Sequence, residues 1–221
     1  MIIKDAVRGK KNMIAIVDYG AGNLTSVLRA ISFLGFDSVI TDKPEEIIKA
    51  DRIIFPGVGA AGSAMEGMKI RGIDTVMEKA FEKSIPMLGI CVGSQIIMDK
   101  SEENNTACLG FIPGEVKAFL KRMKMEHERF LKVPHMGWNS LTIVQDHPLL
   151  TGIHKEDEFY FVHSYYPVPK KKENIFGTTE YGITFAAAIG KNNLFATQFH
   201  LEKSGEPGLL ILKNFCVWEP C

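Results

Sequence analysis

Cys91 is the residue whose surroundings most clearly favour chemistry. It lies between Gly89 and Gly93, where an apolar segment, residues 86–90, runs into the expected start of a helix. Glycines two residues before and after a nucleophile let a strand and a helix pack closely around a sharp turn, as in elbows of the G-x-S-x-G type. Such a turn presents the thiol above the edge of a sheet, where the N–H groups of a helix start favour the reactive thiolate.

An isolated cysteine in an apolar strand is more often a small buried side chain than a nucleophile. The two glycines and the immediate change from strand to helix favour the catalytic interpretation for Cys91. The other cysteines, Cys108, Cys216 and Cys221, lack these surroundings and are interpreted as structural or exposed. Neither a C-x-x-C pair nor a Cys/His cluster with metal-ligand spacing occurs, so we expect no metal and no cofactor.

A cysteine nucleophile needs a histidine that accepts and returns protons, and a third group that orients the imidazole. His200 follows an apolar strand, residues 193–199, and Glu202 comes two residues later. Because residues i and i+2 of an extended chain project to the same side, we expect Glu202 beside the ring of His200. His135 and His163 are weaker candidates, since neither has a carboxylate close in sequence.

The tetrahedral intermediate requires hydrogen-bond donors. The backbone N–H of Val92, directly after the nucleophile, is one candidate. A second loop, P-G-V-G at residues 56–59, follows an expected strand and has the glycine content that lets backbone amides, including those of Val58 and Gly59, approach a ligand. Taken alone, this loop is more typical of an ordinary turn between a strand and a helix.

The first half of the chain alternates strands with amphipathic helices. The expected strands are residues 13–17, 38–41, 52–55 and 87–90, and the expected helices have apolar stripes at 24–34 and 73–81, with a further helix opening at residue 44. This alternation implies a mainly parallel α/β sheet covered on both faces. Later segments, at residues 116–120, 141–144, 159–162, 184–189 and 194–199, are expected as antiparallel additions to that sheet, before a last helix running from Ser204 to about residue 215.

A chain of 221 residues with 46% hydrophobic composition can bury one sizeable core. We expect an extension at residues 1–12, one domain at residues 13–215 and a tail at residues 216–221. Basic and acidic residues both number 26, so net charge favours neither nucleic acid nor an anionic membrane as a partner. The absence of a leader pattern and of an apolar run of about 20 residues favours a cytoplasmic protein.

Several motifs together resemble the class I, or triad, glutamine amidotransferases. They are G-I-C-V-G-S-Q at residues 89–95, P-G-V-G at 56–59 and Q-F-H-L-E-K-S at 198–204. Three more motifs resemble, more narrowly, the glutaminase subunits of imidazole glycerol phosphate synthases: I-V-D-Y-G-A-G-N-L at 16–24, P-H-M-G-W-N at 134–139 and Y-F-V-H-S-Y-Y at 160–166. The resemblance covers residues 13–215, and several motifs in one order are more specific than any single one.

The resemblance implies a flavodoxin-like sheet carrying a triad of Cys91, His200 and Glu202. Cys91 would attack the side-chain amide of glutamine, His200 would protonate the departing ammonia, and water would hydrolyse the glutamyl thioester. The resemblance also implies which residues hold the substrate, namely Gly57, Gln95, His163, Ser164 and Tyr165.

The resemblance further implies a heterodimer with a (βα)8-barrel cyclase, which uses the ammonia in histidine biosynthesis. Asn23, Trp138 and Lys203 match positions near that interface. In the family, the P-G-V-G strand rearranges to complete the oxyanion site once the cyclase ligand binds, so low activity is expected from the chain alone.

The chain departs from the family at Leu201, where proline is usual between the triad histidine and glutamate; this substitution removes a constraint on φ that would help to place Glu202. Residues 121–130 resemble an insertion. Two alternatives stay open at this point. One is a paralogous glutaminase that feeds a synthase of aminated surface sugars, and the other is a catalytically silent regulatory subunit.

Overall fold

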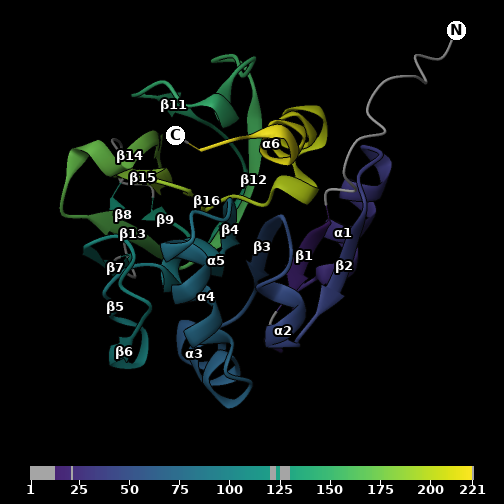
Figure 1. Cartoon of the computed structure of the whole chain (residues 1–221). Helices are drawn as coiled ribbons and strands as arrows, with labels where there is room; N and C mark the ends of the chain where they lie inside the picture. Colours follow the sequence, from purple (N-terminus) through teal and green to yellow (C-terminus); the bar gives the residue numbers. More distant parts are fainter. Residues whose placement is uncertain (1–12, 21, 120–122, 125–129, 221) are drawn as a thin grey trace, which may run out of the picture.

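The computed structural model describes residues 13–20, 22–119, 123–124 and 130–220. The expected extension at residues 1–12 and most of the expected insertion lie outside the described residues. Within the described part, eight strands form the main sheet in the order β11-β14-β15-β16-β4-β3-β1-β2 (Figure 1). The strands are β1 (Ile14–Val17), β2 (Ser38–Thr41), β3 (Arg52–Gly57), β4 (Met87–Cys91), β11 (Thr142–Ile143), β14 (Ile175–Glu180), β15 (Thr184–Lys191) and β16 (Leu194–Thr197).

The sheet is parallel from β2 through β1, β3 and β4 to β16, and antiparallel from β16 through β15 and β14 to β11. The expected α/β class, with a mainly parallel sheet and antiparallel strands from the second half of the chain, is therefore confirmed. Strand β4 lies between β3 and β16. Parallel strands end at one edge of the sheet, so β3, β4 and β16 bring their carboxyl ends together at that edge.

The expectation that the segments at 116–120 and 159–162 join the main sheet is wrong. Strand β7 (Gly114–Ala118) belongs to a separate sheet ordered β13-β7-β5-β6, and β12 (Glu158–His163) pairs with β10 (His135–Ser140). Alternating burial, such as that of β12, identifies a strand but not its partner, which long-range packing selects. The remaining short strands are β5 (Lys100–Ser101), β6 (Thr106–Ala107), β8 (Met123–Lys124), β9 (Phe130–Leu131) and β13 (Tyr165–Pro169).

Helices cover the sheet. The α-helices described are α1 (Leu24–Phe33), α2 (Pro44–Ile47), α3 (Ala61–Ile70), α4 (Ile73–Glu82), α5 (Val92–Ile96) and α6 (Gly205–Val217). The 3-10 helices described are η1 (Glu103–Asn105), η2 (Pro148–Leu150), η3 (Lys172–Asn174) and η4 (Leu201–Lys203). Helix α1 packs against α6, and α3 against α4 and α5. Helix α3 was not expected, because its short side chains form only a weak apolar stripe.

Glycine explains how α3 packs so closely. A Cβ atom at Gly67 would overlap the carbonyl oxygen of Tyr19, so only glycine lets α3 approach the loop after β1.

At the other end of the chain, α6 continues two residues past the expected end, and Trp218 after it is buried. The buried Arg52 donates hydrogen bonds to the carbonyl of Trp218 and to Glu219.

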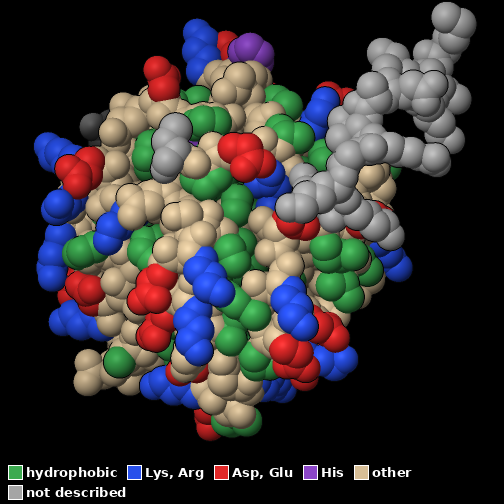
Figure 2. Space-filling view, in the orientation of Figure 1, with side chains coloured by type: hydrophobic (Ala, Val, Ile, Leu, Met, Phe, Trp, Pro, Cys, Tyr) green, Lys and Arg blue, Asp and Glu red, His purple; other side chains and the backbone are tan. Residues whose placement is uncertain are grey.

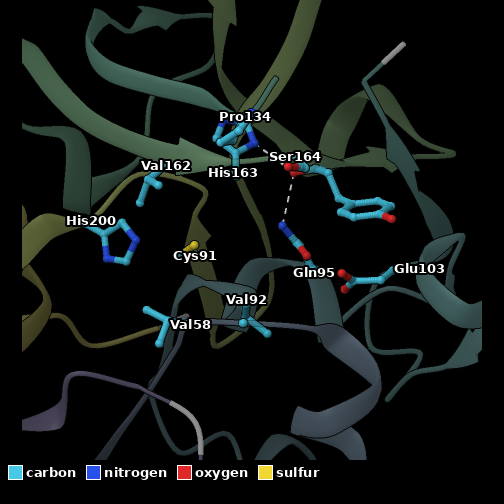
Figure 3. A pocket seen from close by; sticks show the side chains of 12 residues that line it. Val58, Cys91, Val92, Gln95, Glu103, Pro134, Val162, His163, Ser164 and His200 are labelled. Carbon is cyan, nitrogen blue, oxygen red and sulfur yellow. Dashed lines mark hydrogen bonds between the residues drawn. The ribbon is translucent and has the colours of Figure 1, made fainter. Parts of the chain in front are cut away.

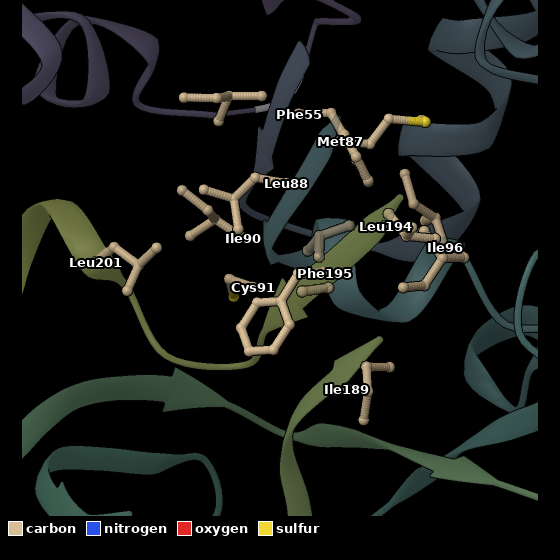
Figure 4. Close-up of a cluster of buried hydrophobic side chains, with 14 of the residues drawn as sticks. Phe55, Met87, Leu88, Ile90, Cys91, Ile96, Ile189, Leu194, Phe195 and Leu201 are labelled. Atoms are coloured by element: carbon tan, nitrogen blue, oxygen red, sulfur yellow. The ribbon is translucent and has the colours of Figure 1, made fainter. Parts of the chain in front are cut away.

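The core surrounds β4, whose five residues are all buried. Side chains from neighbouring strands and from the segment after β16 pack around it, including Phe55, Phe195 and Leu201 (Figure 4). Full burial of one such side chain contributes about 1.5–3 kcal/mol. The strand that carries Cys91 is thus held rigidly from both faces.

Candidate active site

Cys91 occupies a strained turn between β4 and α5. Its backbone has φ 55° and ψ −106°, a combination that residues other than glycine rarely adopt. Both flanking glycines are required by close contacts: a Cβ at Gly89 would lie 2.8 Å from the carbonyl oxygen of Gly93, and a Cβ at Gly93 would overlap that of Phe55. The surrounding packing therefore holds Cys91 in a conformation that an unconstrained chain would leave.

A cavity of about 310 Å³ lies at the carboxyl end of β4, a size suited to a small molecule. Figure 3 shows the side chains of Cys91, Gln95 and His200 converging on it. The full lining is Val58, Gly59, Cys91, Val92, Gln95, Glu103, Pro134, Val162, His163, Ser164, Tyr165 and His200. The loop after β3 and the start of α5, expected as oxyanion donors, thus face the same space as the sulfur.

His200 lies three residues after β16 and is anchored through its backbone. Its N–H donates to the carbonyl of Tyr160 at 2.9 Å, and its own carbonyl accepts from the hydroxyl of Ser204 at 2.6 Å. The ring nitrogen Nδ1 lies 2.8 Å from Oε1 of Glu202. Because the glutamate carboxylate only accepts, Nδ1 donates and Nε2 is left for the cavity side.

The expected reason for that contact is wrong, although the contact forms. Glu202 lies in the 3-10 helix η4 and not in extended chain, so the same-side rule for alternate residues does not apply. The turn of η4 brings the carboxylate back under the ring. Leu201, in the position where proline is usual, is fully buried and anchors this turn by packing.

Burial and neighbouring charges have opposite effects on the pKa of His200. Burial lowers the pKa of its imidazole, but the electrostatic attraction of Cys91, together with the hydrogen bond and charge of Glu202, outweighs burial and raises the pKa to about 9. Among the described residues, its Nε2 atom is buried and has no hydrogen-bond partner. The ring can therefore carry a proton at neutral pH and has one nitrogen free to exchange it with the nucleophile or a leaving group.

Two residues of the site were not expected from sequence. Glu103, in η1, lines the cavity, and its Oε2 accepts from the N–H of Ala61 at 2.7 Å. Gln198 is fully buried, and its Nε2 lies 3.7 Å from the sulfur of Cys91. The order of residues around Glu103 has no pattern that reveals it, whereas Gln198 stands in the Q-F-H motif and could have been singled out.

His163 and His135 are buried neutral histidines. Burial lowers the pKa of His163 to about 3 and that of His135 to about 4. Nδ1 of His163 donates to the carbonyl of Tyr165 at 2.8 Å, and the two rings contact each other at 3.0 Å. A ring with so low a pKa is a poor proton acceptor at neutral pH, so His200 remains the base that the geometry favours.

The comparison with known families agrees with this geometry. Residues 15–218 match the family described as glutamine amidotransferase class-I. The chain belongs to this family. The expected enzyme class, a glutamine amidotransferase with glutaminase activity, is therefore confirmed.

Similar curated proteins indicate which group of glutamine amidotransferases this chain resembles. Imidazole glycerol phosphate synthase subunit HisH of Nitratidesulfovibrio vulgaris is 52% identical over 205 residues, which are 92% of this chain and 95% of that protein. The subunit of the same name from Neisseria meningitidis is 45% identical over 210 residues, 92% of this chain and 99% of that protein. The expected resemblance to such subunits is confirmed.

Solved structures share the fold at low identity. A chain of PurLQS from Thermotoga maritima superposes with a TM-score of 0.70 at 18% identity, covering 93% of this chain and 98% of that one. A glutamine amidotransferase structure superposes with a TM-score of 0.67 at 18% identity, covering 92% and 99%. At this identity the likeness shows the fold alone.

The remaining expected site residues of the amidotransferase lie outside the cavity lining. Gly57 does not line the cavity; it pairs with Cys91 across β3 and β4, where a Cβ would overlap the hydroxyl of Tyr19. Trp138 and Lys203 both contact the ring of Tyr160, edge-on for the indole and at 5.6 Å for the ammonium. Trp138 is 54% exposed.

Asn23 is exposed just before α1. Positive and negative side chains are interspersed over the face shown in Figure 2. In the described part of the chain, no three His, Cys, Asp or Glu side chains are grouped to hold a metal ion. No described helix of the amidotransferase combines the length and the apolar character needed to cross a bilayer.

Proposed function

We propose that this amidotransferase hydrolyses glutamine at Cys91 and supplies the ammonia to the synthase that makes imidazole glycerol phosphate in histidine biosynthesis. The observation that carries the proposal is the convergence of Cys91 and His200, with Glu202 behind the ring, on one cavity of amino-acid size. The identity to two HisH subunits over nearly their full length supports this choice of synthase over a paralogous one.

The reaction begins with a thiolate and an imidazolium. In this ion pair His200 already holds the proton of Cys91 at Nε2, and the sulfur attacks the side-chain carbonyl carbon of glutamine to form a tetrahedral oxyanion. Collapse breaks the C–N bond, the imidazolium gives its proton to the leaving nitrogen, and ammonia departs. Water, deprotonated by His200, then cleaves the thioester to release glutamate and restore the thiol. Glu202 keeps the ring oriented throughout and stabilises its charge.

Backbone donors stabilise the oxyanion in this proposal. The N–H of Val92 follows the nucleophile directly, and Val58 and Gly59 line the same cavity. Gly59 has φ of 94°, a conformation that glycine adopts without strain, so the loop can reorient its peptides at low cost. We propose that this loop supplies the second donor.

Polar groups around the cavity fit the ends of glutamine. The carboxylate of Glu103 is suited to the ammonium group of the substrate, because a charge-assisted hydrogen bond there would fix its orientation. Gln95 and the segment of His163, Ser164 and Tyr165 line the remaining wall. We assign them to hold the substrate.

The proposed partner is a (βα)8-barrel cyclase, bound as a heterodimer. Trp138 and Lys203 lie together over the ring of Tyr160. The backbone carbonyl of Tyr160 accepts from the N–H of His200, and its N–H donates to the hydroxyl oxygen of Ser204. A partner seated on Trp138 and Lys203 would thus press on the segment that carries the base. We assign Asn23 to the same surface. This arrangement accounts for the low activity expected of the chain alone.

The test is reconstitution with a candidate cyclase. The complex with Cys91→Ser is expected to make product from added ammonium but not from glutamine, whereas Cys108→Ser, a half-buried cysteine outside the cavity, keeps both activities. Ammonia release should rise when the cyclase ligand is added. Glutamine-dependent synthesis by Cys91→Ser would refute the assignment of the nucleophile, and wild-type complex without glutamine-dependent synthesis would refute the choice of synthase.

A further inference from the structure

Gln198 links the nucleophile to the substrate-binding wall. The residue stands between β16 and His200 and is fully buried. Its Oε1 accepts a hydrogen bond from Nε2 of Gln95 at 3.1 Å, and its Nε2 lies 3.7 Å from the sulfur of Cys91. The side chain therefore has one end on a cavity-lining amide and the other on the reacting atom.

The carbonyl of Tyr165 determines which way these amides face. A carbonyl oxygen only accepts, so the group of Gln95 that lies 3.1 Å from it must be the NH₂ group. The same NH₂ group contacts Gln198, which must therefore present its oxygen to Gln95. The NH₂ group of Gln198 is then directed to the sulfur of Cys91, as a donor and not as an acceptor.

The same carbonyl is held from the other side by a chain of neutral rings. Nδ1 of His163 can only donate to it, so Nε2 of His163 accepts, and the contact at 3.0 Å must be donated by Nδ1 of His135. Nε2 of His135 then accepts from the side-chain amide of Asn139 at 3.3 Å. Every member of the chain has one consistent direction, which fixes the Tyr165 carbonyl and the orientation of both glutamines.

We propose that Gln198 is a further catalytic residue of the glutaminase reaction, whose side-chain N–H donates to the sulfur of Cys91 and stabilises the thiolate that attacks glutamine. This inference rests on the proposed function. A hydrogen bond to an ion is stronger than one to a neutral group, so the contact gains strength when the sulfur ionises. The other titratable groups facing this region are His200 just before η4, Tyr19 after β1, His163 across the cavity on β12, and Glu103 on η1.

The experiment measures the pH dependence of Cys91 alkylation by iodoacetamide in the full chain, followed by peptide mass spectrometry. Gln198→Met keeps the length of the side chain and removes the donor. We expect the midpoint of its alkylation profile to move up by about one pH unit, as loss of a charge-assisted hydrogen bond requires. Gln198→Glu keeps an acceptor for Gln95 but places a negative group at the sulfur, so its midpoint should rise further.

Gln145→Met is the control for the loss of a hydrogen-bonding glutamine, because the side chain of Gln145 donates to two backbone carbonyls and does not line the cavity. Its alkylation profile should coincide with that of the wild type. A Gln198→Met profile that also coincides with the wild type would overturn the proposal, and if that variant does not fold, an unshifted midpoint for Gln198→Glu overturns it. Alkylation needs neither glutamine nor a partner, so its outcome is separate from ammonia release by the wild-type complex, which tests the proposed function.

Discussion

Replacing Glu202 by glutamine is the change for which the structure predicts the largest and most specific effect. Glu202 contacts Nδ1 of His200 at 2.8 Å, and both side chains are almost fully buried. The variant keeps the shape and removes the charge. Its amide can present either an acceptor or a donor to the ring, so the tautomer with Nε2 free to accept a proton is no longer enforced.

The magnitude follows from the pKa of His200. A value of about 9, against the ordinary 6.5, corresponds to about 3 kcal/mol of preference for the imidazolium form. This contribution to folding is complete below about pH 6.5 and disappears as the pH rises through about 9. Without the carboxylate, the pKa of His200 should fall, so the basic limb of the turnover profile should move down from near pH 9. Loss of the correct tautomer adds a fall in kcat of about 10²–10⁴.

The assay is ammonia release by the cyclase complex between pH 6 and 10, with melting curves at the same pH values. Glu206→Gln is the control, because Glu206 is exposed four residues further on. We expect Glu206→Gln to match the wild type, and Glu202→Gln to lose turnover while remaining folded at neutral pH. A Glu202→Gln enzyme with wild-type kcat and an unmoved basic limb would refute the assigned role of the carboxylate.

Three further substitutions test the remaining parts of the site. Val58→Pro deletes a backbone N–H and should reduce kcat by about 10²–10³, whereas Val58→Ala keeps the N–H and most activity; equal rates would remove Val58 from the oxyanion site. Gly93→Ala forces a Cβ onto the carbonyl of Phe55 and should lower the free energy of unfolding, measured by thermal melting, by about 1–3 kcal/mol. An unchanged Tm would show that the turn around Cys91 can shift to make room for the methyl group. Leu201→Ala opens a cavity in the core and should lower the free energy of denaturant unfolding by about 2–5 kcal/mol, with a fall in kcat. A variant that loses stability but keeps the wild-type kcat would show that the packing of Leu201 does not place Glu202.

Periodicity was enough to predict the parallel half of the fold. The apolar runs of β1, β3 and β4 and the stripes of α1 and α4 are local signals, and the structure follows them within a few residues. Helix α3 was missed because its packing depends on small residues such as Gly67, whose role appears only in contact with Tyr19. The partner strands of β7 and β12 could not be predicted from the local sequence pattern either, because strand pairing depends on contacts between segments that are distant in the sequence.

The site, like the fold, was predicted from sequence where local spacing decides the structure and missed where long-range packing decides it. The spacing of Gly89, Cys91 and Gly93 predicted a sharp turn because close packing on both sides of a nucleophile leaves room only for glycine. The contact of Glu202 was predicted for a reason that the 3-10 turn of η4 does not satisfy. Glu103 reaches the cavity through the packing of η1 against α3, which no short motif encodes.

The most direct test of the account is to isolate the covalent intermediate. Wild-type complex is mixed with glutamine and the cyclase ligand, quenched in acid within one turnover, and digested for peptide mass spectrometry. We predict a glutamyl thioester on the peptide that contains Cys91, formed at a reduced rate in Glu202→Gln and absent in Cys91→Ser. Ammonia release with no glutamyl group on Cys91 at any quench time, or with the group on another residue, would contradict the account.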